Sequence, residues 1–233
     1  MLVVGASTGI GRALAVAAIS AGASVGLVAR RKALLRQLQA TLGRAAVALP
    51  CDVRSAIAVD SMMAMAEQQL GSIDTVVYTV GVNHLSLLAD TGADVWRALL
   101  ETNVVGAALV TKAVLPVLRR SGRPGRVAYL SSHSVPKPWP GLGAYAASKA
   151  ALESMVASWR IEEPDVAFTR VVVGPTMTGM ADAWDPAVAA TMFERWSADG
   201  FLGEHEPVAP EVVADALVAW MIRVEPETDL SMV

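Results

Sequence analysis

Tyr145 and Lys149 are the two residues whose types and spacing suggest chemistry most directly. They stand four residues apart in the alanine-rich run 144–151, and on a helix that spacing places both side chains on one face. A tyrosine hydroxyl has a pKa of about 10, and a neighbouring ammonium group is expected to lower it by roughly 1–3 units. The pair therefore predicts general acid/base work on an alcohol or a carbonyl. The alternative is a surface tyrosine with a helical lysine neighbour.

Ser132 lies thirteen residues before Tyr145 and directly after the apolar run 127–130. A hydroxyl at the end of a strand, beside the start of the Tyr145 helix, would hold a substrate oxygen next to the phenol. Ser131 competes for the same role. His133 follows Ser132 and either lines the substrate pocket or is an ordinary loop histidine.

A glycine-rich turn follows the first apolar stretch of the chain. Residues 1–4 are predicted to form a strand and 12–21 a helix, and the turn between them contains Gly5, Gly9 and Gly11. In this context the glycines allow a tight turn, the approach of a phosphate, and close packing of helix and strand. The helix N-terminus would then bind a pyrophosphate. The alternative is an ordinary turn between a strand and a helix.

The second predicted strand, 24–29, ends at Arg30 and Arg31. In a dinucleotide-binding fold, a carboxylate near this point accepts hydrogen bonds from the ribose hydroxyls, whereas an arginine binds a 2′-phosphate. Two arginines and no acid predict NADP rather than NAD, although at least one of them fits a solvated helix start. Asp52 follows the third strand and suits either the adenine amino group or the N-cap of the next helix.

Predicted strands and helices alternate along the whole chain, which indicates a doubly wound parallel α/β sheet in a single domain over residues 1–233. A long helical region covers 94–120, with Asn103 in its middle, where asparagine is unfavourable by propensity. Residues 179–208 are predicted to be irregular. The strands are expected at 1–4, 24–29, 45–50, 73–79, 126–130, 166–173 and near 229–232.

Composition excludes several classes of function. A net charge of −3 gives no reason to expect nucleic acid, and 54% apolar residues support a large core. The single cysteine, Cys51, excludes an intrachain disulfide, and three scattered histidines predict no metal site. Mean hydropathy is +0.45, but glycines and serines interrupt the most apolar stretch, 13–29, so no membrane segment is expected there. A cytoplasmic protein is predicted.

Together these features resemble a short-chain dehydrogenase/reductase of the compact, non-extended type, over nearly the whole chain. The resemblance rests on Gly5-x-x-x-Gly9-x-Gly11, Asp52-Val53, Asn103, Ser132 and Tyr145-x-x-x-Lys149, in the family's order and near its usual spacings. It implies a Rossmann-type sheet of about seven strands, with residues 177–208 covering the substrate.

The resemblance also implies roles for four catalytic residues. Tyr145 would be the acid/base, and Ser132 would bind the substrate oxygen. Lys149 would bind the nicotinamide ribose and lower the Tyr145 pKa, while Asn103 would kink its helix and hold a water of a proton relay. The residues predicted to contact the dinucleotide are Gly5, Ser7, Thr8, Gly9, Ile10, Gly11, Arg30, Arg31, Asp52, Val53, Gly81, Tyr145, Lys149, Pro175 and Thr178.

Two segments depart from the family pattern. Tyr78-Thr79-Val80-Gly81 replaces Asn-Asn-Ala-Gly and keeps only the glycine, and Gly174-Pro175 inverts the familiar Pro-Gly. Thr178 would still reach the nicotinamide carboxamide.

The predicted function is hydride transfer between NADP(H) and the alcohol or carbonyl group of a small molecule. Tryptophans and methionines in the covering segments favour an apolar substrate, although packing explains them equally well. The alternatives are a non-catalytic dinucleotide-binding regulator and a nucleotide-sugar epimerase or dehydratase. Relatives suggest a homodimer or homotetramer, and no nucleic-acid or membrane partner is expected.

Overall fold

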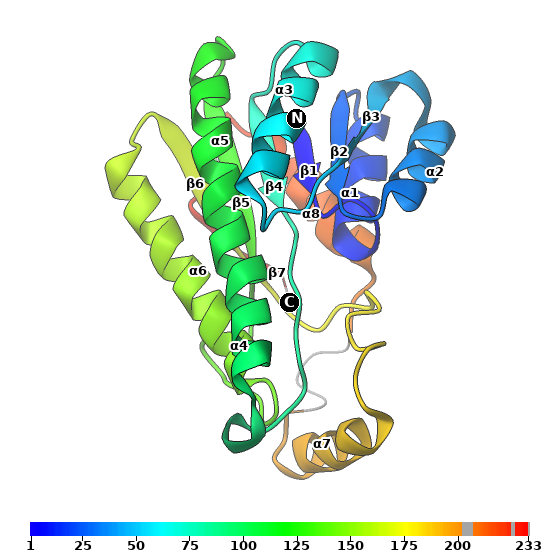
Figure 1. Cartoon of the computed structure of the whole chain (residues 1–233), viewed down its shortest axis with the longest axis vertical. Coiled ribbons are helices and arrows are strands. Elements are labelled where there is room, and N and C mark those ends of the chain that lie inside the picture. The colour runs from blue at the N-terminus through cyan, green and yellow to red at the C-terminus, as the bar shows by residue number, and fades with distance from the viewer. Residues whose placement is uncertain (202–206, 225–226, 233) are drawn as a thin grey trace.

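Seven parallel strands form one sheet in the computed structural model, in the order β3-β2-β1-β4-β5-β6-β7 (Figure 1). The structure describes residues 1–201, 207–224 and 227–232. The strands are β1 Leu2–Val4, β2 Val25–Ala29, β3 Ala46–Pro50, β4 Thr75–Tyr78, β5 Gly125–Ser132, β6 Val166–Val173 and β7 Asp229–Met232. The predicted doubly wound α/β fold is confirmed. Because the strand order reverses between β1 and β4, a ligand crevice is expected at their carboxyl ends.

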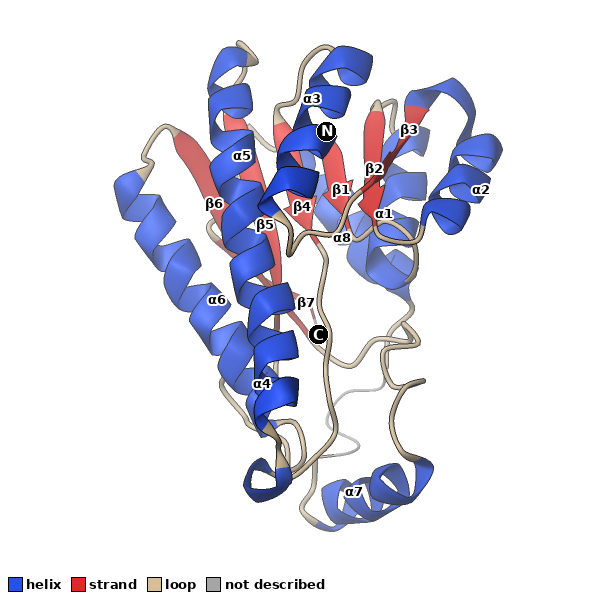
Figure 2. Ribbon diagram, in the orientation of Figure 1, coloured by secondary structure: helices blue, strands red, loops and turns tan. Residues whose placement is uncertain are grey.

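Helices cover both faces of the sheet (Figure 2). Helices α1, α2 and α8 pack on one face, and α3, α5 and α6 on the other. The helix bounds are α1 Gly9–Ser20, α2 Lys32–Leu42, α3 Ala56–Leu70, α4 Ala93–Leu100, α5 Gly106–Arg120, α6 Gly143–Glu162, α7 Pro186–Ala198 and α8 Pro210–Met221. All residues of β1, β2 and β4 are buried, as expected for central strands covered on both faces.

The predicted long helix over 94–120 is interrupted at its centre. Between α4 and α5, the segment Glu101–Val105 forms a π-helical turn, labelled η3, that contains Asn103. Such turns are rare and often accompany functional sites. The run Ala93–Arg120 has the length and apolar character of a membrane-crossing helix, but half of its most apolar window is buried inside the fold. It is therefore a core helix packed against the sheet.

The prediction that residues 179–208 are irregular is wrong, because helix α7 occupies Pro186–Ala198. Asp185 caps this helix by accepting hydrogen bonds from the amides of Ala187 and Val188, and a proline stands in its first turn. An aspartate followed by proline is a recognised helix start. Helix α7 lies beyond the carboxyl ends of the strands (Figure 1). Residues 202–206 of the predicted substrate-covering segment lie outside the described residues.

Candidate active site

The glycine turn between β1 and α1 has the geometry that the sequence predicts. Gly5 and Gly9 have φ angles of +109° and +54°, in the region that side chains rarely adopt. A Cβ at Gly11 would lie 2.4 Å from the Gly5 carbonyl oxygen, so α1 packs closely against the turn. Helix α1 begins at Gly9 without a side-chain cap, and the amides of Ile10 and its neighbours start the helix. This end of the helix therefore suits an anion.

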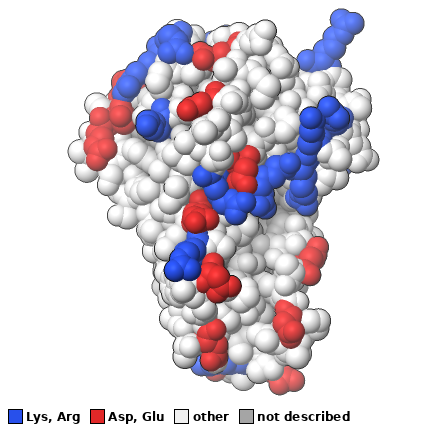
Figure 3. All heavy atoms as spheres, in the orientation of Figure 1, with Lys and Arg blue, Asp and Glu red and all other residues white. Residues whose placement is uncertain are grey.

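Arg31 contacts the glycine turn directly. Its Nη2 donates to Ser7 Oγ at 2.9 Å and to Thr8 Oγ1 at 2.7 Å. Arg30 is exposed, and its charge lowers the pKa of Asp52. Lys and Arg atoms gather near the β2–α2 region on the face that Figure 3 shows. Arg31 thus carries the positive charge closest to the turn among the two predicted arginines.

Asp52 does not cap the helix that follows it. Ser55 is the N-cap of α3 and accepts from the Ala58 amide, so the N-cap alternative is wrong. The Asp52 carboxylate instead binds Arg54, with Nη2 to Oδ2 at 2.6 Å. The hydrogen bond from Arg54 lowers the pKa of Asp52 to about 2. Val53 is buried at 4% exposure.

Tyr78 and Thr79, which depart from the family pattern, use their hydroxyls to hold the backbone. Tyr78 Oη donates to the Thr102 carbonyl, in the π-helical turn, at 2.9 Å. Thr79 Oγ1 donates to the Val4 carbonyl at 2.9 Å, which ties the ends of β4 and β1 together. A Cβ at Gly81 would lie 3.2 Å from Lys149 Nζ. The altered segment therefore still places a glycine against Lys149.

Asn103 is fully buried and holds three backbone or side-chain groups. Its Oδ1 accepts from the Val82 amide at 2.8 Å, and its Nδ2 donates to the Val82 carbonyl and to Ser148 Oγ, both at 2.9 Å. Ser148 in turn donates to the Tyr145 carbonyl at 2.7 Å. Ser148 therefore joins Asn103 to the turn of α6 that carries Tyr145.

Ser132, Tyr145 and Lys149 come together where β5 ends and α6 begins. Tyr145 and Lys149 are 8% and 3% exposed. Lys149 Nζ lies 5.9 Å from the Tyr145 ring centroid and donates to the Leu130 carbonyl at 2.8 Å. The Ser132 hydroxyl acts on the Tyr145 phenol and lowers its pKa, against the larger effect of burial. This is the proximity that the spacing of the three residues predicts.

Burial dominates the protonation of this pair in the free protein. It raises the pKa of Tyr145 to about 12, although the hydrogen bond with Ser132 opposes the shift. It also lowers the pKa of Lys149 to about 8. The expectation that Lys149 brings the Tyr145 pKa below its ordinary value is therefore wrong for the free protein, since desolvation outweighs the cation.

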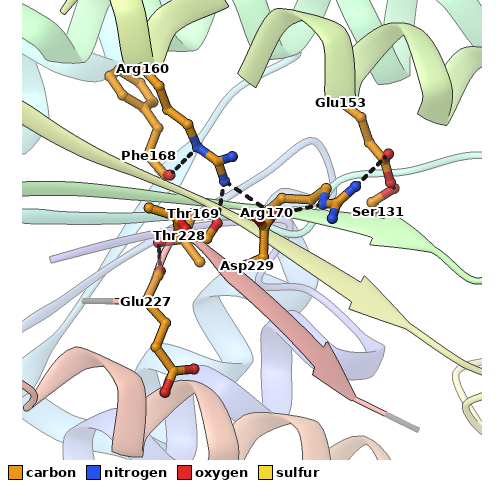
Figure 4. Close-up of polar contacts among 9 residues, drawn as sticks. All are labelled: Ser131, Glu153, Arg160, Phe168, Thr169, Arg170, Glu227, Thr228 and Asp229. Carbon is orange, nitrogen blue, oxygen red and sulfur yellow. Dashed lines mark hydrogen bonds and ion pairs between the residues drawn. The ribbon is translucent and has the colours of Figure 1, made fainter. Parts of the chain in front are cut away.

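The serines on either side of Ser132 face different partners. Ser131 Oγ donates to Glu153 Oε1 at 2.5 Å, and Arg170 Nη1 donates to Glu153 Oε2 at 3.0 Å (Figure 4). Ser134 donates to Ser132 Oγ through its amide at 3.1 Å and its hydroxyl at 3.0 Å. Ser134 is not among the residues predicted from the sequence. The Ser-x-Ser spacing, which allows a side-chain turn, is the signal that points to it.

The segment after β6 closes over the glycine turn. Thr178 lies against Gly9, where an added Cβ would be 3.1 Å from the Thr178 Cβ. Pro175 and His133 line a cavity of about 500 Å³, together with Trp139, Phe201 and Arg170. Neither Ser132 nor Tyr145 lines this cavity, whose wall includes residues of β6 and β7. Within the described residues, no group of three metal-binding side chains occurs.

Aromatic side chains join α7 to the loop between β5 and α6. Trp196 stacks edge-on against Trp139, with ring centroids 5.2 Å apart, and donates to the Pro140 carbonyl at 2.8 Å. Trp184 donates to Asn83 Oδ1 at 3.1 Å. Trp196 and Met192 are buried in this cluster and are structural.

A sequence profile described as short chain dehydrogenase matches residues 1–189. A short chain dehydrogenase of Pseudocercospora fijiensis is 38% identical over 171 residues, which are 69% of this chain and 53% of that protein. Glycine betaine reductase ATRR of Emericella nidulans is 31% identical over 93% of this chain and 17% of its own length. An uncharacterized oxidoreductase of Staphylococcus epidermidis is 30% identical, over 93% of this chain and 88% of its own. The chain thus spans about half of the first relative and a smaller part of the second.

Solved structures share the fold over the full length. A short-chain dehydrogenase from Streptomyces avermitilis has a TM-score of 0.83 at 29% identity, covering 100% of this chain and 87% of that one. Serine dehydrogenase complexed with NADP⁺ has a TM-score of 0.87 at 22% identity, covering 99% and 93%. A short-chain dehydrogenase/reductase from Burkholderia phymatum in complex with NAD has a TM-score of 0.84 at 20% identity, covering 99% and 87%. At this identity the last two show the fold alone.

Proposed function

The chain belongs to the short-chain dehydrogenase/reductase family of NAD(P)-dependent oxidoreductases, and we propose that it is an NADP(H)-dependent enzyme acting on the carbonyl or secondary alcohol of a small apolar molecule. The observation that carries this proposal is the meeting of Ser132, Tyr145 and Lys149 at one end of the sheet. Gly81, beside Lys149, belongs to the segment that follows β4 at the crevice between β1 and β4.

Tyr145 is proposed as the general acid in carbonyl reduction. Its pKa of about 12 keeps it protonated at neutral pH, as a proton donor must be. Ser132 hydrogen-bonds the same substrate oxygen, and the bound reduced nicotinamide supplies the hydride. Lys149 holds the nicotinamide ribose and stabilises the phenolate left after proton transfer. Asn103 fixes the Val82 backbone and, through Ser148, the turn that carries Tyr145, and it is proposed to hold the relay water.

Arg31 is the main support for NADP over NAD. Its guanidinium already binds two hydroxyls of the glycine turn, so a 2′-phosphate there would meet both the cation and the hydroxyl donors. The Gly5–Gly11 turn is proposed to hold the pyrophosphate. Asp52 and Val53 are proposed to hold the adenine, and Pro175 and Thr178 the nicotinamide side.

The covering segment supports an apolar substrate. Met177, Met180 and Phe193 keep 61%, 39% and 46% of their surfaces exposed, unlike the buried Trp196. Met180 also lies near Gly81, within 3.8 Å of a Cβ built there. Flexible apolar side chains of this kind suit a hydrophobic carbonyl compound. A cytoplasmic homodimer or homotetramer, with residues 1–233 as one domain, completes the proposal.

A panel of aliphatic, alicyclic and aromatic ketones, followed by NADPH absorbance, tests the proposed function. We expect NADPH-dependent reduction of apolar ketones by the unmodified protein and a rate lower by about 10²–10⁴-fold for Tyr145→Phe. NADPH binding without turnover on any carbonyl or alcohol would favour a non-catalytic regulator. Tighter binding of NADH than of NADPH would overturn the cofactor assignment.

A further inference from the structure

Ser132 is held by a neighbour outside the family's catalytic set. Its Oγ accepts two hydrogen bonds from Ser134, one from the amide at 3.1 Å and one from the hydroxyl at 3.0 Å. Ser134 is buried at 4% exposure, so solvent does not compete strongly for its hydroxyl. A serine oxygen has two lone pairs and one proton. Both acceptor positions of Ser132 are therefore filled.

The two hydrogen bonds from Ser134 leave the Ser132 hydroxyl with its proton as the one remaining hydrogen-bonding group. With both lone pairs engaged, the remaining function of its hydroxyl is to donate the proton. The Ser132 hydroxyl lowers the pKa of Tyr145, as expected of a donor beside the phenol oxygen, although burial raises that pKa more strongly. The hydrogen bond from the Ser134 hydroxyl to Ser132 therefore lies next to the Tyr145 side chain. Lys149, with Nζ 5.9 Å from the Tyr145 ring centroid, is the cation that faces the same ring.

We propose that Ser134 is a positioning residue that fixes the Ser132 hydroxyl as a donor toward the Tyr145 oxygen and the substrate oxygen, an inference that rests on the proposed function. A donor in this place stabilises the negative charge that develops on a carbonyl oxygen during reduction. Without Ser134, the Ser132 hydroxyl can rotate and accept a hydrogen bond instead, so that the population aimed at the reacting oxygens falls.

Ser131 provides the matched control. It directly precedes Ser132 and, like Ser134, is buried at 4% exposure. Its hydroxyl, however, donates to Glu153, which Arg170 binds in turn, and Asp229 accepts from Arg170 Nε at 2.8 Å (Figure 4). Removal of the Ser131 hydroxyl therefore perturbs the end of β5 next to Ser132 without removing either hydrogen bond from Ser134 to Ser132.

Ionisation of Tyr145 can be followed without knowledge of the substrate. The chain has three tyrosines, and burial raises the pKa of Tyr78 and Tyr129 beyond that of Tyr145. Tyrosinate absorbance after rapid pH jumps, read before alkaline unfolding and checked by circular dichroism, thus reports Tyr145. The NADP⁺-saturated protein is used, and Tyr145→Phe must remove the first transition.

Ser134→Ala is expected to raise the Tyr145 midpoint by about half a pH unit and to lower kcat about three- to tenfold, since one neutral hydrogen bond is removed from the chain. Turnover is measured on the best ketone of the panel. Ser131→Ala should leave both readouts unchanged. The side chains introduced by Ser134→Thr and Ser134→Val have nearly the same shape, but only Thr keeps a hydroxyl. Ser134→Thr should therefore keep the Tyr145 midpoint and kcat of the unmodified protein, whereas Ser134→Val should raise the midpoint and lower kcat as Ser134→Ala does.

Equal effects of Ser134→Ala and Ser131→Ala, or of Ser134→Thr and Ser134→Val, would overturn the inference in favour of a merely structural role. An unchanged midpoint and kcat in Ser134→Ala would also overturn it, while Tyr145→Phe remains inactive and the proposed function stands. Full turnover of Tyr145→Phe would overturn the proposed function itself, and this inference with it. If Ser134→Ala does not fold, the Thr and Val pair decides.

Discussion

The wall of the site formed by β5, η3 and α6 differs from the segment that covers it. In the wall, Asn103, Tyr145 and Lys149 are buried and hydrogen-bonded to groups from several elements. In the covering segment, aromatic contacts secure α7 through Trp196, while Phe193 remains exposed on the same helix. Fixed polar geometry suits proton transfer, whereas exposed apolar side chains suit ligand recognition. The comparison indicates that reaction type and substrate preference are encoded in separate parts of the molecule.

The largest effect is expected when the wall loses its acid. Tyr145→Phe should lower kcat/KM for ketone reduction by about 10²–10⁴-fold, because proton transfer to the oxygen is lost. NADPH affinity, measured by fluorescence titration, should change little. If Tyr145→Phe turns over ketones at the rate of the unmodified protein, Tyr145 is not the general acid and the wall takes no part in the reaction.

A second change tests the cofactor side of the crevice. Arg31→Asp should weaken NADPH binding about 10- to 100-fold, since a charge-assisted contact with the 2′-phosphate becomes repulsive. NADH binding should be nearly unchanged. Arg36→Asp, an equal charge change at an exposed position of α2, is the control. Equal losses in both variants would show that general charge, and not the contact with the glycine turn, governs affinity.

Lys149 separates activity from stability within the wall. Its pKa falls from an ordinary 10.5 to about 8, so between these values the unfolded chain binds more protons than the folded protein. The free energy of unfolding therefore gains from this group as pH rises through that window, and below it the buried ammonium costs stability. Lys149→Met should abolish reduction yet raise the free energy of unfolding at pH ~7 by about 1–2 kcal/mol, the gain shrinking toward pH ~10.

Urea unfolding at both pH values measures this difference, and Lys112→Met, at an exposed position of α5, is the control. A Lys149→Met protein that is less stable than the unmodified one at neutral pH would show that the Leu130 hydrogen bond outweighs desolvation of the ammonium.

The smallest effects are expected in the covering segment. Phe193→Ala should change KM for apolar ketones about threefold and lower the melting temperature only slightly, because the side chain is half exposed although its ring lies 5.1 Å from that of Trp196. Trp196→Phe should do the reverse: it removes the hydrogen bond to Pro140 and lowers stability by about 1 kcal/mol with little change in substrate ranking. Identical effects of the two substitutions would show that Trp196 and Phe193 do not have separate roles in anchoring α7 and in recognising the substrate.

The parts that sequence predicts well are those set by short-range patterns. Sequence patterns located all seven strands, and the bounds predicted for β6 agree to the residue. The glycine spacing predicted the turn at Gly5–Gly11, because positive φ angles and close packing leave few other residues possible. Ser132 acts on the pKa of Tyr145, which agrees with the predicted proximity of the two residues, while their catalytic roles stay predictions.

What sequence missed depends on contacts between distant segments or on the balance of opposing effects. Arg31 is distinguished from Arg30 only by its reach to Ser7, and Tyr78 finds its partner 24 residues away. The direction of the Tyr145 pKa shift requires knowledge of burial, which no spacing supplies. Helix α7 is a different case, because Asp185 followed by a proline is a helix start that the sequence shows. The helix was not predicted because the surrounding tryptophans and methionines were interpreted as an irregular covering segment.

The π-helical turn at Glu101–Val105 makes the length of this stretch as important as its composition. Deletion of a single residue here would let α4 and α5 merge into one regular α-helix. Such a helix is intrinsically more favourable than one with a π-helical turn. Each α-helical residue turns the chain by about 100°, however, so residues on one side of the deletion would rotate by that amount relative to the other. Because α5 would stay packed against the sheet, Asn103 would rotate away from Val82 and Ser148. The shortened protein, although its helix is more regular, would then be a poorer catalyst.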